Sequence, residues 1–102
     1  MTKFIDGPAQ GVILMLKAAP HHLRVTRDTN GKWDALDNPA DVPLVTETLY
    51  VYELVGEASA YHIRKKGGGG FFSMADYRLC ASQPTDQEMR DSGRWWKWYQ
   101  EH

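Results

Sequence analysis

The sequence predicts a mainly β domain, either a small antiparallel barrel or a strongly curved sheet, that a C-terminal helix closes. Short runs rich in β-forming residues alternate between polar and apolar along most of the chain. Glycine, asparagine and proline separate these runs, and the main helix-start signal comes near the C-terminus. We expect a single domain over 1–102, with a β core at about 3–82 and a helical segment at about 85–101.

Composition and charge limit the possible partners. The chain of 102 residues is 42% hydrophobic and 25% charged, as is typical of a globular domain with one modest core. Its formal net charge of −1 argues against long nucleic acid as the partner, because binding to a polymer needs a broad excess of Lys and Arg. A small phosphorylated ligand needs only a local basic cluster and stays compatible with this charge.

The single cysteine, Cys80, has no partner for an internal disulfide, which favours an intracellular setting. We expect it to be a small buried hydrophobic residue on a strand. The longest apolar run, 12–16, is too short to cross a bilayer or to form the core of a signal peptide. We therefore expect no membrane association.

Strands and a hairpin are predicted in the first third of the chain. Residues 3–5 form a short edge strand, and the run 12–17 is apolar at both alternating sets of positions, which predicts a strand buried on both faces. Residues 22–27 alternate cleanly between polar and apolar. The Asn30-Gly31 pair that follows is a strong hairpin signal, and Trp33 begins the returning strand.

Longer strands are predicted in the middle of the chain, after a loop rich in Asp and Pro. The longest covers 44–55 and is rich in β-forming residues. We expect residues 56–59 to turn the chain, so that 60–66 pairs back on this strand. After the glycines, residues 71–81 are predicted to form a further strand.

The C-terminal segment begins with a capping box, in which Thr85 is the N-cap and Glu88 lies three residues further on. Gly93 weakens its middle, so we expect one bent helix or two short ones. Four aromatic residues then follow that cannot share one helical face, namely Trp95, Trp96, Trp98 and Tyr99. They either cap the open end of the barrel or form a partner interface, and this crowding of aromatics in a small chain predicts a homo-oligomer.

The most distinctive stretch is 61–72, YHIRKKGGGGFF, which contains four consecutive glycines. Glycine lets backbone N–H groups approach an anion closely, and basic side chains beside it strengthen the attraction. Phe71 and Phe72 could stack on a base. One interpretation is a phosphate-binding loop; the other is a flexible hairpin tip whose basic residues are only solvated.

A His-x-Arg pattern occurs on two predicted strands, once as His22 and Arg24 and once as His62 and Arg64. In a strand these pairs lie on one face, so the two strands could present four anion-binding groups on one surface or across a subunit interface. The alternative is two solvent-facing polar stripes, and in either case the arginines should matter little for stability. The predicted ligand-binding residues are His22, Arg24, His62, Arg64, Lys66, Gly68, Gly69, Gly70, Phe71 and Phe72.

An enzymatic alternative uses the same histidines. A metal-independent phosphodiesterase could employ His22 and His62 as acid and base. His21 and Cys80 add further possible metal ligands, but no spacing matches a known ligand pair, so we expect no metal and no cofactor.

Several segments resemble a family of small accessory proteins of tailed bacteriophages and prophages. The resemblance rests on FIDGPAQGVILML, GKWDALD, TETLYVYEL and the stretch from HIR through the glycines to YRL, and spans most of the chain. Phage accessory proteins of this size include sponges that sequester nucleotide signals of bacterial immunity. The resemblance implies a counter-defence role in the cytoplasm of a bacterial host, through binding of a cyclic nucleotide or ADP-ribose derivative without turnover. Cleavage of a cyclic nucleotide is the enzymatic alternative, and a protein-binding inhibitor or structural phage component is a third.

Overall fold

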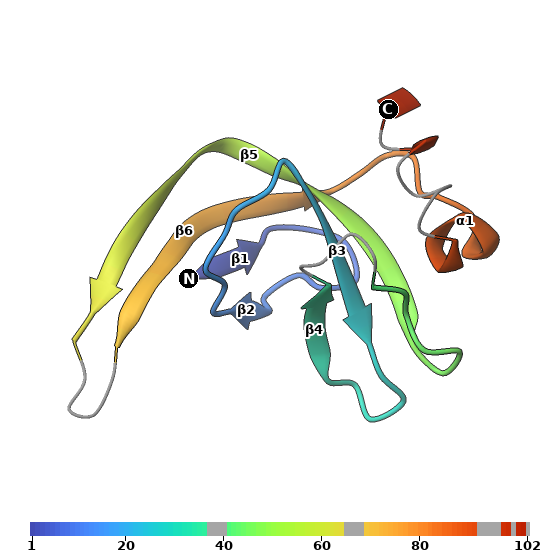
Figure 1. Cartoon of the computed structure of the whole chain (residues 1–102), viewed down its shortest axis with the longest axis horizontal. Coiled ribbons are helices and arrows are strands. Elements are labelled where there is room, and N and C mark those ends of the chain that lie inside the picture. Colours follow the sequence, from blue (N-terminus) through green and yellow to red (C-terminus); the bar gives the residue numbers. More distant parts are fainter. Residues whose placement is uncertain (37–40, 65–68, 92–96, 99, 102) are drawn as a thin grey trace.

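A curved six-stranded sheet forms the body of the computed structural model (Figure 1), which describes residues 1–36, 41–64, 69–91, 97–98 and 100–101. The elements in chain order are β1 (Thr2–Phe4), β2 (Ile13–Leu14), β3 (His22–Arg27), β4 (Trp33–Leu36), β5 (Thr48–Ile63), β6 (Gly70–Leu79) and α1 (Asp86–Arg90). The sheet curls into a nearly closed barrel, and α1 follows it near the C-terminus. The predicted fold class is confirmed.

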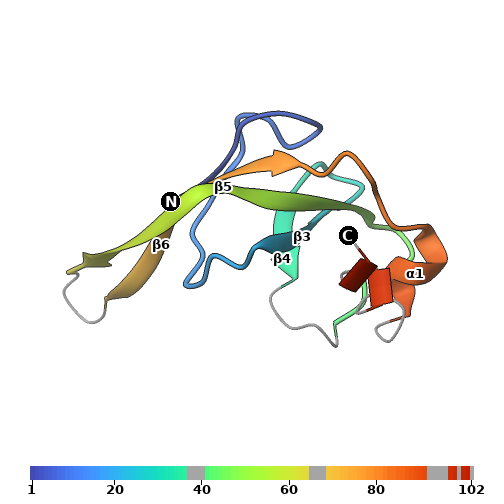
Figure 2. The ribbon, with the colours of Figure 1, turned by 90° about the horizontal axis from the view of Figure 1, so that it is seen from above.

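The strand order is β2-β1-β6-β5-β3-β4, so the two longest strands lie at the centre of the sheet. All neighbouring strands are antiparallel except the pair of β1 and β6, which is parallel. β1 is therefore an interior strand and not the predicted edge strand. Figure 2 shows β5 and β6 extending from the body at one end of the molecule, with α1 at the other end.

The run 12–17 is not the doubly buried strand that its apolar residues predict. Only β2 is a strand there, and it lies at the edge of the sheet, where Ile13 is 52% exposed. Leu14, Val12 and Leu16 are half-buried against the core. An apolar run by itself does not show how many faces neighbouring elements cover, and here only one face is covered.

β5 is one continuous strand, although the sequence predicts a turn at 56–59. Gly56 has φ +70° and lies at a β-bulge, where the pairing with β6 shifts between Val55 and Ser59. A glycine at positive φ fits either a turn or a bulge, and the bulge bends the strand without ending it. Beyond the bulge, residues 59–63 and 70–74 form a projecting two-stranded segment, hereafter the arm.

The main core lies on one face of the sheet. Its buried members are Phe4, Ala9, Leu23, Val25, Tyr52, Ala75 and Tyr77. The Tyr52 hydroxyl donates to the Asp6 carbonyl (3.0 Å) and accepts from the Ala9 N–H (2.9 Å), and the Tyr77 hydroxyl donates to the Pro20 carbonyl (2.6 Å). Both phenols thus hold loops against the core, and burial raises the pKa of each.

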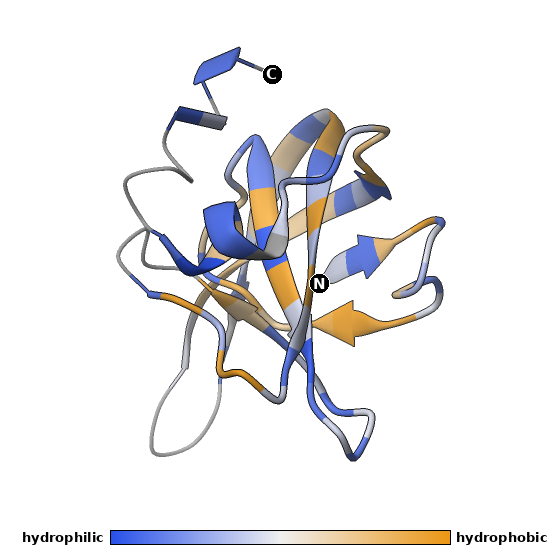
Figure 3. Cartoon of the chain, turned by 90° about the vertical axis from the view of Figure 1, so that its right-hand side faces the viewer, coloured by the Kyte–Doolittle hydropathy of each residue, from blue (hydrophilic) through white to orange (hydrophobic). Residues whose placement is uncertain are grey.

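A second core lies on the opposite face of the sheet, beneath the C-terminal segment. It contains Leu49, Val51, Cys80, Met89 and Trp98, with Leu36 packed against it. In Figure 3, orange and blue residues alternate along the strands, as expected when the two faces differ in their surroundings. The small chain therefore buries apolar side chains on both faces of part of its sheet.

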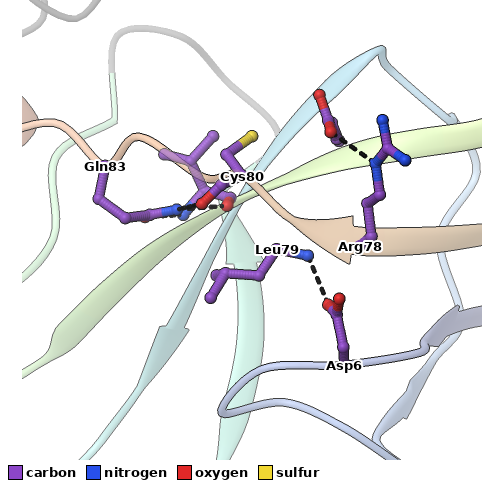
Figure 4. Close-up of polar contacts among 7 residues, drawn as sticks. Asp6, Arg78, Leu79, Cys80 and Gln83 are labelled. Carbon is purple, nitrogen blue, oxygen red and sulfur yellow. Dashed lines mark hydrogen bonds and ion pairs between the residues drawn. The ribbon is translucent and has the colours of Figure 1, made fainter.

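Side-chain hydrogen bonds fix the start of α1 and connect the chain just before it to the second core. The predicted capping box is confirmed: Thr85 Oγ1 accepts from the Glu88 N–H (3.2 Å), and the Glu88 carboxylate accepts from the Thr85 N–H (3.1 Å). The Gln83 side chain accepts from the Val51 N–H (2.8 Å) and donates to the carbonyls of Val51 and Cys80, both at 2.9 Å (Figure 4). The Gln83 side chain thus bonds the backbone of β5 at Val51 as a neighbouring strand would, after β6 has ended at Leu79.

The predicted aromatic cluster is described only in part. Trp98 is buried in the second core, whereas Trp95, Trp96 and Tyr99 lie outside the described residues. Residues 97–98 and 100–101 are helical, which agrees with a second helical piece after α1. In the described part of the chain, the helices are too short and too polar to span a membrane.

Candidate functional site

The first His-x-Arg pair does not form a solvent-facing stripe, which corrects the predicted polar face of β3. Arg24 is 2% exposed and Thr26 is 1% exposed, while His22 is half-buried. Arg24 is paired with Val51 on β5, a member of the second core, and with Leu36 on β4, which packs against that core. Met89 and Trp98 pack with Val51 on this face, so Arg24 is not available to a ligand in solvent.

Burial also affects the charge of Arg24. It lowers the pKa of the guanidinium by desolvation, and the negative charge of Asp41 acts in the opposite direction. Arginine stays protonated even so, because its ordinary pKa is far above neutrality. Arg24 therefore contributes a buried cation and a long aliphatic stem to the second core.

Replacing Arg24 by alanine should therefore destabilise the protein by about 2–4 kcal/mol, since the packing of the stem and the interactions of a buried charge are lost together. Arg64→Ala is the matched control. Arg64 is exposed, so its loss should change the free energy of unfolding by less than about 0.5 kcal/mol. Urea unfolding measures both values, and equal stabilities of the two variants would show that Arg24 is not embedded as described.

The second His-x-Arg pair lies on the arm and is exposed. His62 on β5 faces Phe71 on β6, and their ring centroids are 4.7 Å apart at an interplanar angle of 50°. Phe71 is 67% exposed, so this ring pair is open to solvent. Arg64 lies just beyond the end of β5, two residues after His62, and is exposed as well.

The remaining predicted ligand-binding residues surround this pair. Phe72 is half-buried and contacts Tyr61, with 6.2 Å between the ring centroids. Gly70 begins β6 opposite residue 63, and Gly69 precedes it. Lys66 and Gly68 lie outside the described residues. At the base of the arm, the Ser73 N–H donates to the Leu16 carbonyl (2.8 Å), which ties β6 to the N-terminal segment.

The two His-x-Arg pairs do not meet within one chain. His22 lies opposite Glu53 on β5, and His62 is nine positions further along the same strand. Nine residues of an extended strand span about 30 Å, which the bend at Gly56 shortens only in part. The arm is remote from β3 in Figure 1 as well. Convergence of the pairs across a subunit interface stays a prediction.

This separation also bears on the enzymatic alternative. An acid and a base that act on one phosphodiester bond must both lie within hydrogen-bond reach of it. His22 and His62 of a single chain do not satisfy this requirement. The geometry thus gives the phosphodiesterase hypothesis no support within one chain.

A different cluster of ligating side chains lies at the start of β3. One ligand atom from each of His21, His22 and Glu53 lies within 4.8 Å of the others. Glu53 also receives an ion pair from Arg78, with 2.6 Å between Nε and Oε1, and Figure 4 shows the position of Arg78 on β6. Sequence spacing missed this cluster, because Glu53 reaches the histidines only through strand pairing.

Beside this cluster the surface has a small pocket, which is lined by His22, Glu53, Cys80, Ala81, Ser82 and Trp98. Cys80 is buried, as expected, but it lies just after the end of β6 and not on a strand. Burial raises the pKa of its thiol to about 11, the charge of Glu53 adds to this effect, and Arg78 opposes it. At neutral pH the side chain is therefore a thiol and a poor nucleophile.

The described residues define a small barrel-like β protein with a projecting arm and a covered outer face. Comparisons with protein-family models, curated proteins and solved structures gave no match. The resemblance to phage accessory proteins therefore stays a hypothesis that rests on the sequence segments alone.

Proposed function

We propose that this protein binds a small nucleotide-like ligand on the arm and does not turn it over. The observation that carries the proposal is the exposed ring pair of His62 and Phe71, with the exposed Arg64 two residues after His62. A nucleotide presents an aromatic base and an anionic phosphate. The arm offers a stacking surface for the first and a cation for the second.

The positions of these groups favour a shared ligand. His62 and Phe71 are a directly opposed pair, so their rings lie on one face of the arm. Stacking of a base on an aromatic ring is worth about 1–3 kcal/mol. A charge-assisted hydrogen bond from Arg64 to a phosphate adds about 1.5–3 kcal/mol.

Gly70 completes this surface. A Cβ added at Gly70 would meet no atom within 4 Å, so the backbone there is open on that side. A ligand could therefore approach the Gly70 backbone on this side without meeting a side chain of Gly70 itself.

A homo-oligomer would improve such a site. The arm projects from the body, so one copy supplies only one wall around a small ligand. A second copy could supply the opposite wall and bury apolar surface such as Phe71 and Met74, which are 67% and 46% exposed. Light scattering at micromolar concentration tests this part of the proposal, and a monomeric mass would contradict it.

The role in phage counter-defence rests on the sequence resemblance alone. It directs the choice of probes toward cyclic dinucleotides and cyclic ADP-ribose isomers. The protein is incubated with each compound, denatured and analysed by chromatography. Depletion of the free compound with intact recovery supports sequestration, whereas new products would identify an enzyme.

Variants of the arm then locate the site by isothermal titration. Arg64→Ala should weaken binding at least about tenfold, since one charge-assisted hydrogen bond is lost. Phe71→Ala should weaken it similarly through the loss of stacking. Gly70→Ala should weaken binding without a change in thermal stability, because the added Cβ has free space in the unliganded protein.

Arg27→Ala is the control for charge, since Arg27 is also exposed but contacts Trp33 on the body, 5.7 Å from the ring centroid. It should bind as tightly as the parent. If Arg64→Ala and Phe71→Ala retain parental affinity for a compound that the parent binds, the arm is not the binding site.

A protein-binding role is the second candidate, and a different surface favours it. In the segment 41–47, Val42, Leu44 and Val45 are 47%, 67% and 85% exposed. Adjacent exposed apolar side chains are common at protein interfaces. If no compound of the panel binds, this inhibitor or structural role becomes the better hypothesis.

A further inference from the structure

We propose that His21, His22 and Glu53 bind a first-row divalent transition-metal ion such as Zn²⁺. Two imidazoles and one carboxylate form a common ligand set for zinc. This set favours transition metals over Ca²⁺ and Mg²⁺, which prefer ligands that are all oxygen. The site lies on the body of the protein, away from the arm, and the inference does not rest on the proposed function.

The backbone holds the three side chains next to one another. The Leu54 N–H donates to the His21 carbonyl (2.8 Å), and His22 is paired directly with Glu53. The rings of His21 and His22 meet edge to face, with 4.7 Å between their centroids. The ring of Trp98 also meets His22 edge to face, with 5.9 Å between the centroids.

The distances are close to those of a coordinated site. In a tetrahedral site with bonds of about 2.1 Å, ligand atoms lie about 3.4 Å apart. The present atoms, all within 4.8 Å of one another, need to close by at most about 1.4 Å. Rotation of the exposed His21 side chain and adjustment of Glu53 could supply this movement, because neither is fully buried.

The ion pair with Arg78 is compatible with metal binding. Arg78 contacts Oε1 of Glu53, and a carboxylate has a second oxygen. Carboxylate ligands of metals are commonly hydrogen-bonded by neighbouring groups. Three protein ligands leave a coordination position for water or another small ligand, next to the pocket lined by Ser82 and Trp98.

Titration of the tag-free, metal-stripped protein with Zn²⁺ tests the inference, and Co²⁺ provides an optical signal for the coordination geometry. We expect one Zn²⁺ per chain. His21→Ala and Glu53→Gln should each lower the affinity at least about tenfold. His21 is exposed, and Glu53→Gln keeps the side-chain shape, so circular dichroism should show both variants folded.

His62→Ala is the matched control, because His62 is an exposed histidine on the arm. It should bind Zn²⁺ as the parent does. The inference is overturned if the parent does not bind Zn²⁺ at micromolar concentration, if His21→Ala and Glu53→Gln bind it unchanged, or if His62→Ala abolishes binding.

Discussion

Gly7→Ala should destabilise the protein by at least about 3 kcal/mol. Gly7 has φ +69°, a conformation that costs an L-residue about 1–2 kcal/mol. An added Cβ would also lie 2.8 Å from the Tyr52 hydroxyl oxygen and 3.0 Å from Leu79 Cβ. The hydroxyl would have to move and would lose its bonds to Asp6 and Ala9, at a further cost of about 1–3 kcal/mol.

Gly31→Ala is the matched control for this prediction. Gly31 has φ +84°, and a Cβ there would meet nothing within 4 Å. Gly31→Ala should therefore lose only the cost of the backbone conformation, about 1–2 kcal/mol of stability. Urea unfolding of both variants and the parent gives the difference, which measures the contact with Tyr52. Equal losses for the two variants would mean that the turn at Gly7 adapts without moving Tyr52.

Trp98→Ala should cost about 3–5 kcal/mol, because a large side chain that is 4% exposed leaves the second core. The loss of the Trp98 side chain should also make Cys80 accessible, because both residues belong to the second core. In the parent, a thiol reagent should label Cys80 slowly at pH 8. The thiol is buried, and a pKa of about 11 leaves only about one molecule in a thousand as thiolate. The variant should react faster.

Lys97→Ala is the control on the same segment, since Lys97 is exposed. It should change stability by less than about 0.5 kcal/mol and leave the labelling rate as in the parent. Rapid labelling of the native parent, or an unchanged labelling rate in Trp98→Ala, would contradict the burial of Cys80 by the packing of Trp98.

Features that depend on residues close together in the chain were predictable from the sequence. The hairpin at Asn30-Gly31 forms as expected, with Gly31 at positive φ and the Asp28 carboxylate accepting from the N–H groups of Asn30 and Lys32. The capping box of Thr85 and Glu88 also forms. In both cases the interacting groups lie within four residues, so local chemistry decides the structure.

For the candidate site, the sequence identified the exposed groups of the arm but not their relation to β3. It indicated His62 and Phe71, whose rings are in contact at an exposed position, and Arg64, which is exposed two residues after His62. It also grouped Arg24 with them, although Arg24 is buried. Alternation along a strand shows which residues share a face but not what covers that face.

Only the tertiary structure decided how distant segments combine. Gly56 could have turned the chain, but pairing with β6 on both sides of the bulge keeps β5 continuous. Glu53 meets His22 because of the register between β3 and β5, and Arg24 is buried because Trp98 and Met89 pack over the same face. Each outcome depends on contacts between residues far apart in sequence, so no local pattern contains it. The sequence by itself thus determined the β class, the hairpin and the helix start, and the packing of the C-terminal segment decided which polar residues remain accessible.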